Sequence, residues 1–138
     1  MDVGLDSAAD AVPGQAARAV ILLDTNAIIW LDGHHRRARP LLRQPSPLRI
    51  SPASLLELQF LSDVGRIRVN LPEVIADDRW TIDEPPALAW FTRAAEELWT
   101  RDPFDRLLVA HARLRGWRLA TGDTAILDQL RARERVDL

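Results

Sequence analysis

The chain has 138 residues, 47% of them hydrophobic, which indicates a globular domain with a sizeable core and excludes disorder throughout. It contains no cysteine, which excludes disulfides, zinc–thiolate sites and a thiol nucleophile. All 18 basic residues are arginine and the net charge is −2, so the chain as a whole does not attract nucleic acid and any phosphate contact would come from guanidinium groups.

Residues 1–18 are small, polar and without a hydrophobic pattern, and we expect them to form a flexible N-terminal extension. They have neither the basic nor the apolar region of a signal peptide, and no apolar run in the chain approaches the ~18 residues needed to cross a bilayer. These features predict a cytoplasmic protein without membrane contact. Its single folded domain is expected over residues 19–138.

The first half of this domain alternates between short strands and helices. The continuous apolar run Val20–Leu23 is typical of a central parallel strand that is covered on both faces. After it we expect a helix over 27–31, an arginine-rich helix over 34–43 that buries Ala38, Leu41 and Leu42, a strand over 48–50, a helix over 52–64 ended by Gly65, and a helix over 71–77.

The second half continues the alternation, and together the two halves predict the fold class. We expect a strand over 80–82, a helix from Pro85 to about Leu98, a helix over 104–115, a strand over 117–120, a helix over 124–130 and an edge strand over 135–137. Strands alternating with helices predict right-handed crossovers and a three-layer α/β/α sandwich around a mostly parallel twisted sheet of about four or five strands. Such sheets bind ligands beyond the carboxyl ends of their strands, where the strand order reverses.

Four acidic residues stand where this sheet would bring them together. They are Asp24 after the first strand, Glu57 within the 52–64 helix, Asp105 at the start of the 104–115 helix and Asp123 after the 117–120 strand. Carboxylates are hard oxygen ligands that favour Mg²⁺ or Mn²⁺, and such an ion can bind a phosphate and lower the pKa of a water. The pattern therefore predicts a metal-dependent phosphodiesterase.

Each acid also has a purely structural explanation. Asp24 and Asp123 could cap the helices that follow them, and Asp105 could be a favourable first-turn anion after an N-cap at Asp102. Glu57 could form a capping box with Ser54, although it lies in the apolar stretch 55–61, which we expect to be largely buried. Caps require no common location, whereas a metal site does, so the combination favours the site.

Four segments resemble, in order and spacing, the PIN-domain family, and most closely the VapC-type toxins of bacterial toxin–antitoxin pairs. They are residues 22–26, 50–58, 101–110 and 120–123, and Asp-Pro-Phe-Asp-Arg within the third is the most specific. The resemblance covers about residues 20–130 and implies a Mg²⁺- or Mn²⁺-dependent endoribonuclease that is usually dimeric and is silenced by a cognate antitoxin. By position it places the catalytic, metal-binding acids on Asp24, Glu57, Asp105 and Asp123.

Several neighbours of these acids are expected to support them. Thr25 or Asn26 could orient water or phosphate, or could simply cap the first helix. Asp102 could take the place of Asp105 as a metal ligand, or it could support the ligands without contacting the metal itself. The candidate phosphate contacts are Arg36, Arg37, Arg39, Arg43, Arg101 and Arg106, each of which could instead be a solvated surface residue.

Two other functions stay open on the sequence. The first is a phosphatase with an aspartyl nucleophile, but such enzymes typically carry a second aspartate two positions after the first, where this chain has Asn26. The second is a non-catalytic PIN-like regulatory domain that binds RNA or protein. Substitution of Asp24 would distinguish an enzyme from a binding domain: an enzyme would lose cleavage while keeping its fold, whereas a binding domain would keep its function.

Overall fold

The computed structural model describes residues 19–138, so the extension predicted over 1–18 lies outside the described residues. Five strands in this part of the chain form one sheet, parallel throughout, in the order β3-β2-β1-β4-β5. They are β1 (Ile21–Leu23), β2 (Leu48–Ile50), β3 (Thr81–Ile82), β4 (Arg118–Thr121) and β5 (Arg135–Asp137). The expectation of a mostly parallel sheet with an edge strand over 135–137 is confirmed.

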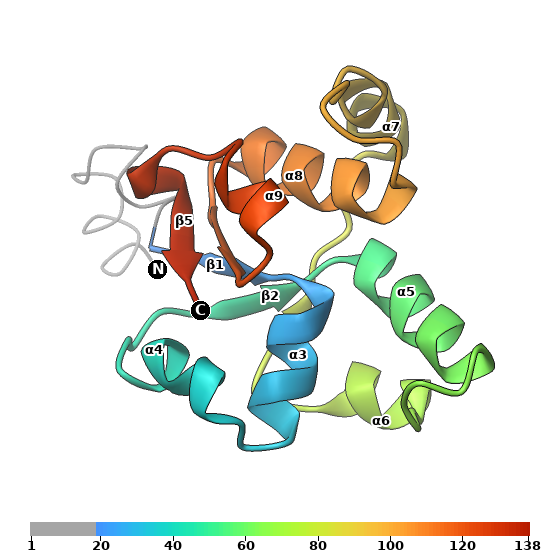
Figure 1. The fold of residues 1–138 in the computed structure, drawn as a ribbon, viewed down its shortest axis with the longest axis vertical. Helices are drawn as coiled ribbons and strands as arrows, with labels where there is room; N and C mark the ends of the chain where they lie inside the picture. Colours follow the sequence, from blue (N-terminus) through green and yellow to red (C-terminus); the bar gives the residue numbers. More distant parts are fainter. Residues whose placement is uncertain (1–18) are drawn as a thin grey trace, which may run out of the picture.

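Helices connect the strands and cover both faces of the sheet. They are α3 (Thr25–Asp32), α4 (Arg39–Leu42), α5 (Pro52–Asp63), α6 (Leu71–Ala76), α7 (Ala87–Ala95), α8 (Pro103–Arg115) and α9 (Thr124–Leu127), with 3₁₀ turns η1 (Arg36–Ala38) and η2 (Ala132–Glu134). Figure 1 shows α3 and α4 on one side of the sheet and α8 on the other. The predicted α/β sandwich is therefore confirmed.

The central strand β1 is buried on both faces. Ile21 and Leu23 pack in the core cluster that includes Ile28 of α3, whereas Leu22 packs with Val109 of α8. All three strand residues are 0% exposed. Because successive side chains of a strand point to opposite faces, a strand buried on both faces must be apolar without alternation, as this one is.

Three predicted helices are wrong in extent. In place of the helix expected over 34–43, the 3₁₀ turn η1 is followed directly by the short helix α4, which has Pro40 in its first turn, where proline has no N–H to continue the preceding turn. Leu42, expected to be buried, is 73% exposed. The helix expected to reach Leu98 ends at Ala95, and the chain then turns to bury Glu97.

The last helix, α9, ends at Leu127 rather than at residue 130. The Arg135 guanidinium donates to the carbonyl oxygens of Leu127 and Leu130 at 2.9 and 3.0 Å, and Arg113 donates to that of Gln129 at 2.7 Å. Arginine side chains thus satisfy carbonyls that a longer helix would have used.

The strand order reverses between β1 and β4. From β1 the chain adds β2 and β3 on one side, and it adds β4 and β5 on the other. Asp24 directly follows β1, and Asp123 lies two residues after β4. Both carboxylates therefore stand at the crevice where a parallel sheet binds ligands. No helix within residues 19–138 is long and apolar enough to cross a membrane.

Candidate functional site

A cavity of about 180 Å³ opens at the carboxyl ends of β1 and β4. All four predicted acids line it, and so do three of their predicted neighbours. The acidic lining is Asp24, Glu57, Asp102, Asp105 and Asp123, with Thr25 and Asn26 beside them. The fold thus brings to one place acids that the sequence carries on separate elements.

Asp24 serves as the N-cap of α3 at the floor of this acid cavity. Its Oδ1 accepts a hydrogen bond from the Ala27 N–H at 2.6 Å, and the residue is only 4% exposed. Burial raises the pKa of Asp24 to about 6, against hydrogen bonds from Thr121 and Ala27 that lower it, and the negative charges of Glu57 and Asp123 raise it further. The capping explanation for Asp24 is confirmed.

Glu57 reaches the acid cavity from α5 and is oriented by Thr25. The Thr25 hydroxyl donates a short hydrogen bond to Glu57 Oε1 and lies 3.2 Å from the Ser54 hydroxyl. Burial raises the pKa of Glu57; the Thr25 bond lowers it, and the charges of Asp102 and Asp123 raise it. Thr25, 4% exposed in the first turn of α3, does not cap that helix, and neither does Asn26.

The capping box predicted for Ser54 and Glu57 is wrong. The N-cap of α5 is Ser51, whose side chain accepts from the Ala53 N–H, and the Ser54 N–H bonds the Ser51 carbonyl instead. Nor is the stretch 55–61 largely buried, because Leu56 is 64% exposed and Phe60 51%. Proline favours the first position of a helix, and Pro52 occupies it in α5. The helix therefore begins before Ser54, so Ser54 cannot be its N-cap. Glu57 is consequently free to face the acid cavity.

Asp102 and Asp105, at the start of α8, differ in what their carboxylates bind. The Asp102 side chain caps the helix by accepting from the N–H groups of Phe104 and Asp105 at 2.8 and 3.3 Å. Within residues 19–138 no hydrogen bond is donated to the Asp105 carboxylate. Burial raises the pKa of Asp105 to about 7, and the charges of Asp102, Asp123, Glu57 and Asp24 add to that rise. Of this pair, Asp105 has the carboxylate with both oxygens available.

Asp123 caps α9 from a turn that closes the acid cavity on the β4 side. Its Oδ1 accepts from the N–H groups of Ala125 and Ile126 at 2.8 and 3.2 Å, and its own N–H bonds the Thr121 hydroxyl at 3.0 Å. These bonds confirm the capping explanation for Asp123. As for Asp24, the capping hydrogen bonds of Asp123 end on one carboxylate oxygen, Oδ1.

Arg37 braces the turn that carries Asp123, a role that the sequence did not indicate. Its guanidinium lies 4.2 Å from the Trp30 ring centre and donates to the carbonyl oxygens of Gly122 and Leu138 at 3.4 and 3.2 Å. A Cβ added to Gly122 would stand 2.4 Å from Arg37 Nη2 and 2.9 Å from the Trp30 ring, so only glycine fits there. Arg37, predicted as a phosphate contact, is engaged within the protein.

None of the six predicted arginines lines the acid cavity. Arg106 donates to the Thr100 carbonyl at 2.7 Å. The arginine that does line it is Arg66, which the sequence reasoning missed. Gly65, with φ of 80°, and the bond from the Arg66 N–H to the Leu61 carbonyl turn the chain back at the end of α5. The sequence signal that could have indicated Arg66 is the Gly65-Arg66 pair, because a glycine that ends the Glu57 helix turns the next residue back toward that helix.

In the part of the chain that the structure describes, residues 19–138, no arginine pairs with the four predicted acids, although Arg66 lines the same cavity. No three His, Cys, Asp or Glu side chains in this range are arranged to hold a metal ion as they stand. The cavity of about 180 Å³ has room for several waters, and Mg²⁺ usually keeps several of its own. The carboxylates therefore fit a hard divalent cation that is held partly through water.

Comparison with known proteins identifies the family. Residues 21–132 match the family model of the PIN domain. Ribonuclease VapC22 from Mycobacterium tuberculosis is 29% identical over 112 residues, which cover 75% of this chain and 86% of that protein. A chain of a toxin–antitoxin complex from Klebsiella pneumoniae shares the fold with a TM-score of 0.61 and 21% identity, over 84% of this chain and 95% of that one. Matched over most of its length, the chain belongs to the PIN-domain family.

Proposed function

We propose that this protein is an endoribonuclease that hydrolyses RNA phosphodiester bonds with Mg²⁺ or Mn²⁺, and that it is the toxin of a bacterial toxin–antitoxin pair. The observation that carries the proposal is the convergence of carboxylates on one cavity, where no ion pair within residues 19–138 involves the four predicted acids. A relative named as a ribonuclease, aligned over 112 residues, supports RNA as the substrate. A phosphatase with an aspartyl nucleophile is less well supported, because the position two residues after Asp24 is Asn26 rather than a second aspartate.

Asp24, Glu57, Asp105 and Asp123 are the proposed metal ligands. When bound, the metal supplies a water of lowered pKa and positive charge next to the scissile phosphate. The capping hydrogen bonds of Asp24 and Asp123 fix the orientation of these carboxylates, and the Thr25 hydroxyl fixes that of Glu57. Such fixed geometry reduces the reorganisation needed when a metal and a substrate bind.

Arg66 is the proposed phosphate contact inside the acid cavity. Among residues 19–138 it is the only cationic residue that lines this cavity, and its backbone is held by the turn that ends α5. A guanidinium can donate two parallel hydrogen bonds to phosphate oxygens. Since the reaction does not use the 2′-hydroxyl, the products are expected to carry 5′-phosphate and 3′-hydroxyl ends.

The test is cleavage of total cellular RNA by wild-type protein and by Asp24→Asn, each with Mg²⁺, with Mn²⁺ and with EDTA, followed by sequencing of the 5′ ends. Asparagine also caps helices well, so the variant should stay folded. We expect discrete metal-dependent cuts that fall at least about 100-fold in the variant. Cleavage that survives both EDTA and the substitution would contradict the proposal. Absence of cleavage by a folded, metal-binding protein would indicate the non-catalytic regulatory domain.

The proposed partners are a cognate antitoxin and a second copy of the chain, with the protein acting in the cytoplasm, where its RNA substrate lies. Large apolar side chains exposed on the described surface support protein contacts. Leu56 and Phe60 of α5 are 64% and 51% exposed, and the Phe60 ring lies 6.3 Å from that of Phe104. If this face forms the dimer, Phe60→Glu should convert a dimer to a monomer in light scattering, and an unchanged mass would remove the face from the proposal.

A further inference from the structure

A net charge of −2 and a cavity lined by carboxylates leave open how this protein would retain RNA. A second polar cavity, of about 490 Å³, offers an answer. Four arginines line it, and we call it the arginine cavity. They are Arg93 of α7, Arg113 of α8, and Arg131 and Arg133 next to and within η2.

The charges of the arginine cavity are largely uncompensated. Arg113 is fixed by Glu97, with Nη1 3.0 Å from both carboxylate oxygens. Within residues 19–138, Arg93, Arg131 and Arg133 have no ion pair. One carboxylate, that of Glu134, lines the cavity, 4.0 Å from Arg113 Nε. Several guanidinium groups therefore face solvent around a space that can hold an anion.

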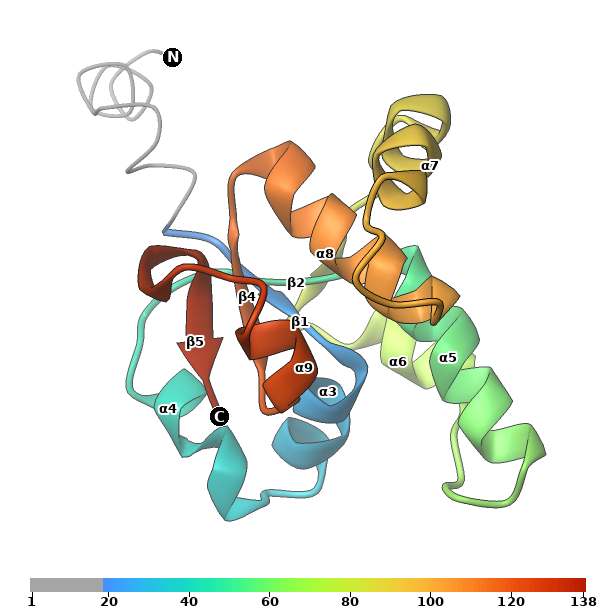
Figure 2. The same cartoon turned by 45° about the horizontal axis from the view of Figure 1, so that its top comes forward.

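The arginine cavity follows the acid cavity along two neighbouring segments. On α8, Leu108 lines the acid cavity and Ala112, one turn later on the same face, lines the arginine cavity. On the next segment Ile126 lines the first and Arg131 the second. Helix α8 rises about 12 Å between Asp105 and Arg113. Figure 2 shows α8 and the segment that contains α9 running beside each other, and Arg113 joins them through the Gln129 carbonyl.

We propose that the arginine cavity binds the phosphate backbone of the RNA substrate at a distance from the scissile bond. Guanidinium groups pair bidentately with phosphate, and the half-buried Trp117 at the same cavity offers a ring to a base. A strand that places one phosphate in the acid cavity and runs along α8 reaches these arginines. The inference rests on the proposed ribonuclease function, and it predicts that substrates must extend several nucleotides beyond the cut.

The test compares Arg131→Gln/Arg133→Gln with a control, both in full-length protein that carries Asp24→Asn to prevent cleavage. The control, Arg68→Gln/Arg79→Gln, removes the same charge from exposed residues that line neither cavity. Fluorescence anisotropy measures the binding of a 24-nucleotide RNA and of a tetranucleotide over a series of salt concentrations. Circular dichroism checks the fold, and Arg133→Gln alone is a milder variant at an exposed side chain.

We expect the double variant to bind the long RNA about 10-fold more weakly, with a salt dependence that is shallower by about 1.4 to 1.8 in log–log slope for two lost phosphate contacts. Binding of the tetranucleotide should be unchanged, and the control should behave as its parent. Equal affinity and slope for the double variant would overturn the proposal. So would binding of a poly-glutamate peptide that the double variant loses while its RNA affinity stays constant, because the cavity would then serve an acidic protein.

The two proposals fail in different ways. If wild-type protein cleaves RNA but the double variant binds it normally, the arginine cavity is not a substrate site and the ribonuclease function stands. If the wild type does not cleave and the Asp24→Asn parent binds no RNA in the presence of Mn²⁺, both proposals fall.

Discussion

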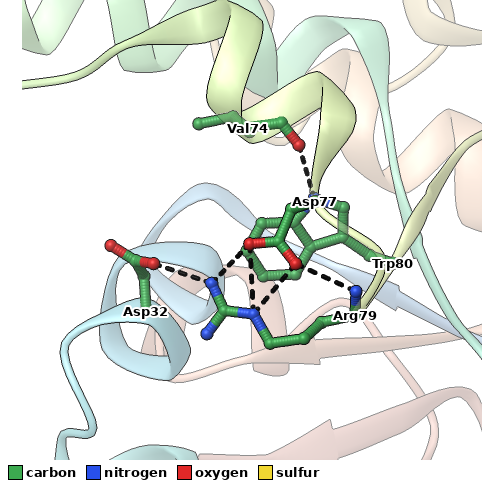
Figure 3. A network of polar contacts seen from close by, with 5 residues as sticks. All are labelled: Asp32, Val74, Asp77, Arg79 and Trp80. Carbon is green, nitrogen blue, oxygen red and sulfur yellow. Dashed lines mark hydrogen bonds and ion pairs between the residues drawn. The ribbon is translucent and has the colours of Figure 1, made fainter.

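The two ends of helix α3 carry carboxylates in opposite surroundings. At the carboxyl end, Asp32 pairs with Arg79 Nη2 at 2.7 Å, and Arg79 also pairs with Asp77 at 2.6 Å (Figure 3). Hydrogen bonds from Arg79 lower the pKa of Asp77. At the amino end, Asp24 faces other acids, and burial raises its pKa to about 6. The same chain thus neutralises one acidic cluster and leaves the other unpaired.

A third cluster, around Asp83, also pairs its carboxylate with basic side chains. Asp83 accepts from Arg115 Nε at 2.8 Å and lies 2.7 Å from His111 Nε2, and these hydrogen bonds lower the pKa of Asp83 in spite of its burial. In both this cluster and the one around Arg79, the carboxylates pair with an arginine. The acid cavity differs because, within residues 19–138, no ion pair compensates its four predicted acids.

The largest expected effect comes from disturbing the acid cavity through Gly122→Ala. The new methyl group would stand 2.4 Å from Arg37 Nη2, so the brace must move and with it the turn that carries Asp123. We expect at least about a 10-fold loss of cleavage rate and a destabilisation of about 1–3 kcal/mol, measured by single-turnover kinetics and urea unfolding. Wild-type cleavage by this variant would show that the turn need not be held in place.

A smaller effect is expected when one repelling charge is removed by Asp105→Asn in EDTA. Because the folded state raises the pKa of Asp105 from 3.8 to about 7, the stability that this group provides is full below about pH 4 and is lost as the pH rises through 7. The variant should therefore match wild type at low pH and be about 1–2 kcal/mol more stable at pH 8.

Urea unfolding of both proteins at about pH 3.5, below the unfolded pKa, and at pH 8 measures this difference, and comparison at equal pH cancels other titrating groups such as His111. Adding Mg²⁺ should reverse the order, because only the wild type gains the full binding energy. Equal stability at pH 8 in EDTA would mean that the charges of the acid cavity do not repel one another as inferred.

The smallest effect is expected at the paired cluster, with Arg79→Gln. The Arg79 side chain is 36% exposed and that of Asp32 is 70% exposed, so solvent screens the pairs and the loss should be about 1 kcal/mol. Cleavage should stay within about 2-fold of wild type, since α3 keeps its amino end in place. A large loss of cleavage would show that the paired cluster at the carboxyl end of α3 affects the acid cavity at its amino end. Arg68→Gln serves as the matched control.

Much of the fold and of the acid cavity could be predicted because the signals are local. The apolar run before Asp24 gives the central strand, and Gly-Asp after the β4 strand gives the next carboxyl end. Once the sheet is parallel, its geometry brings these ends together without further information. The caps of Asp24, Asp102 and Asp123 follow from the same local rules, which is why capping and cavity lining coincide.

What the sequence did not reveal depends on contacts between distant segments. Arg37 meets Gly122 and Leu138, which no local pattern relates to it. The early end of α9 depends on Arg135, a strand residue that bonds backward to helix carbonyls. Long arginine side chains can reach several partners, so their role is decided by the assembled fold.

The most direct test of the central claim is Mn²⁺ binding, measured by calorimetry on metal-free wild type, Asp24→Asn and Asp77→Asn. If the acid cavity is the metal site, wild type and Asp77→Asn should bind with the same affinity, and Asp24→Asn should bind at least about 10-fold more weakly. Equal affinity for all three proteins, or no binding by the wild type, would contradict the account.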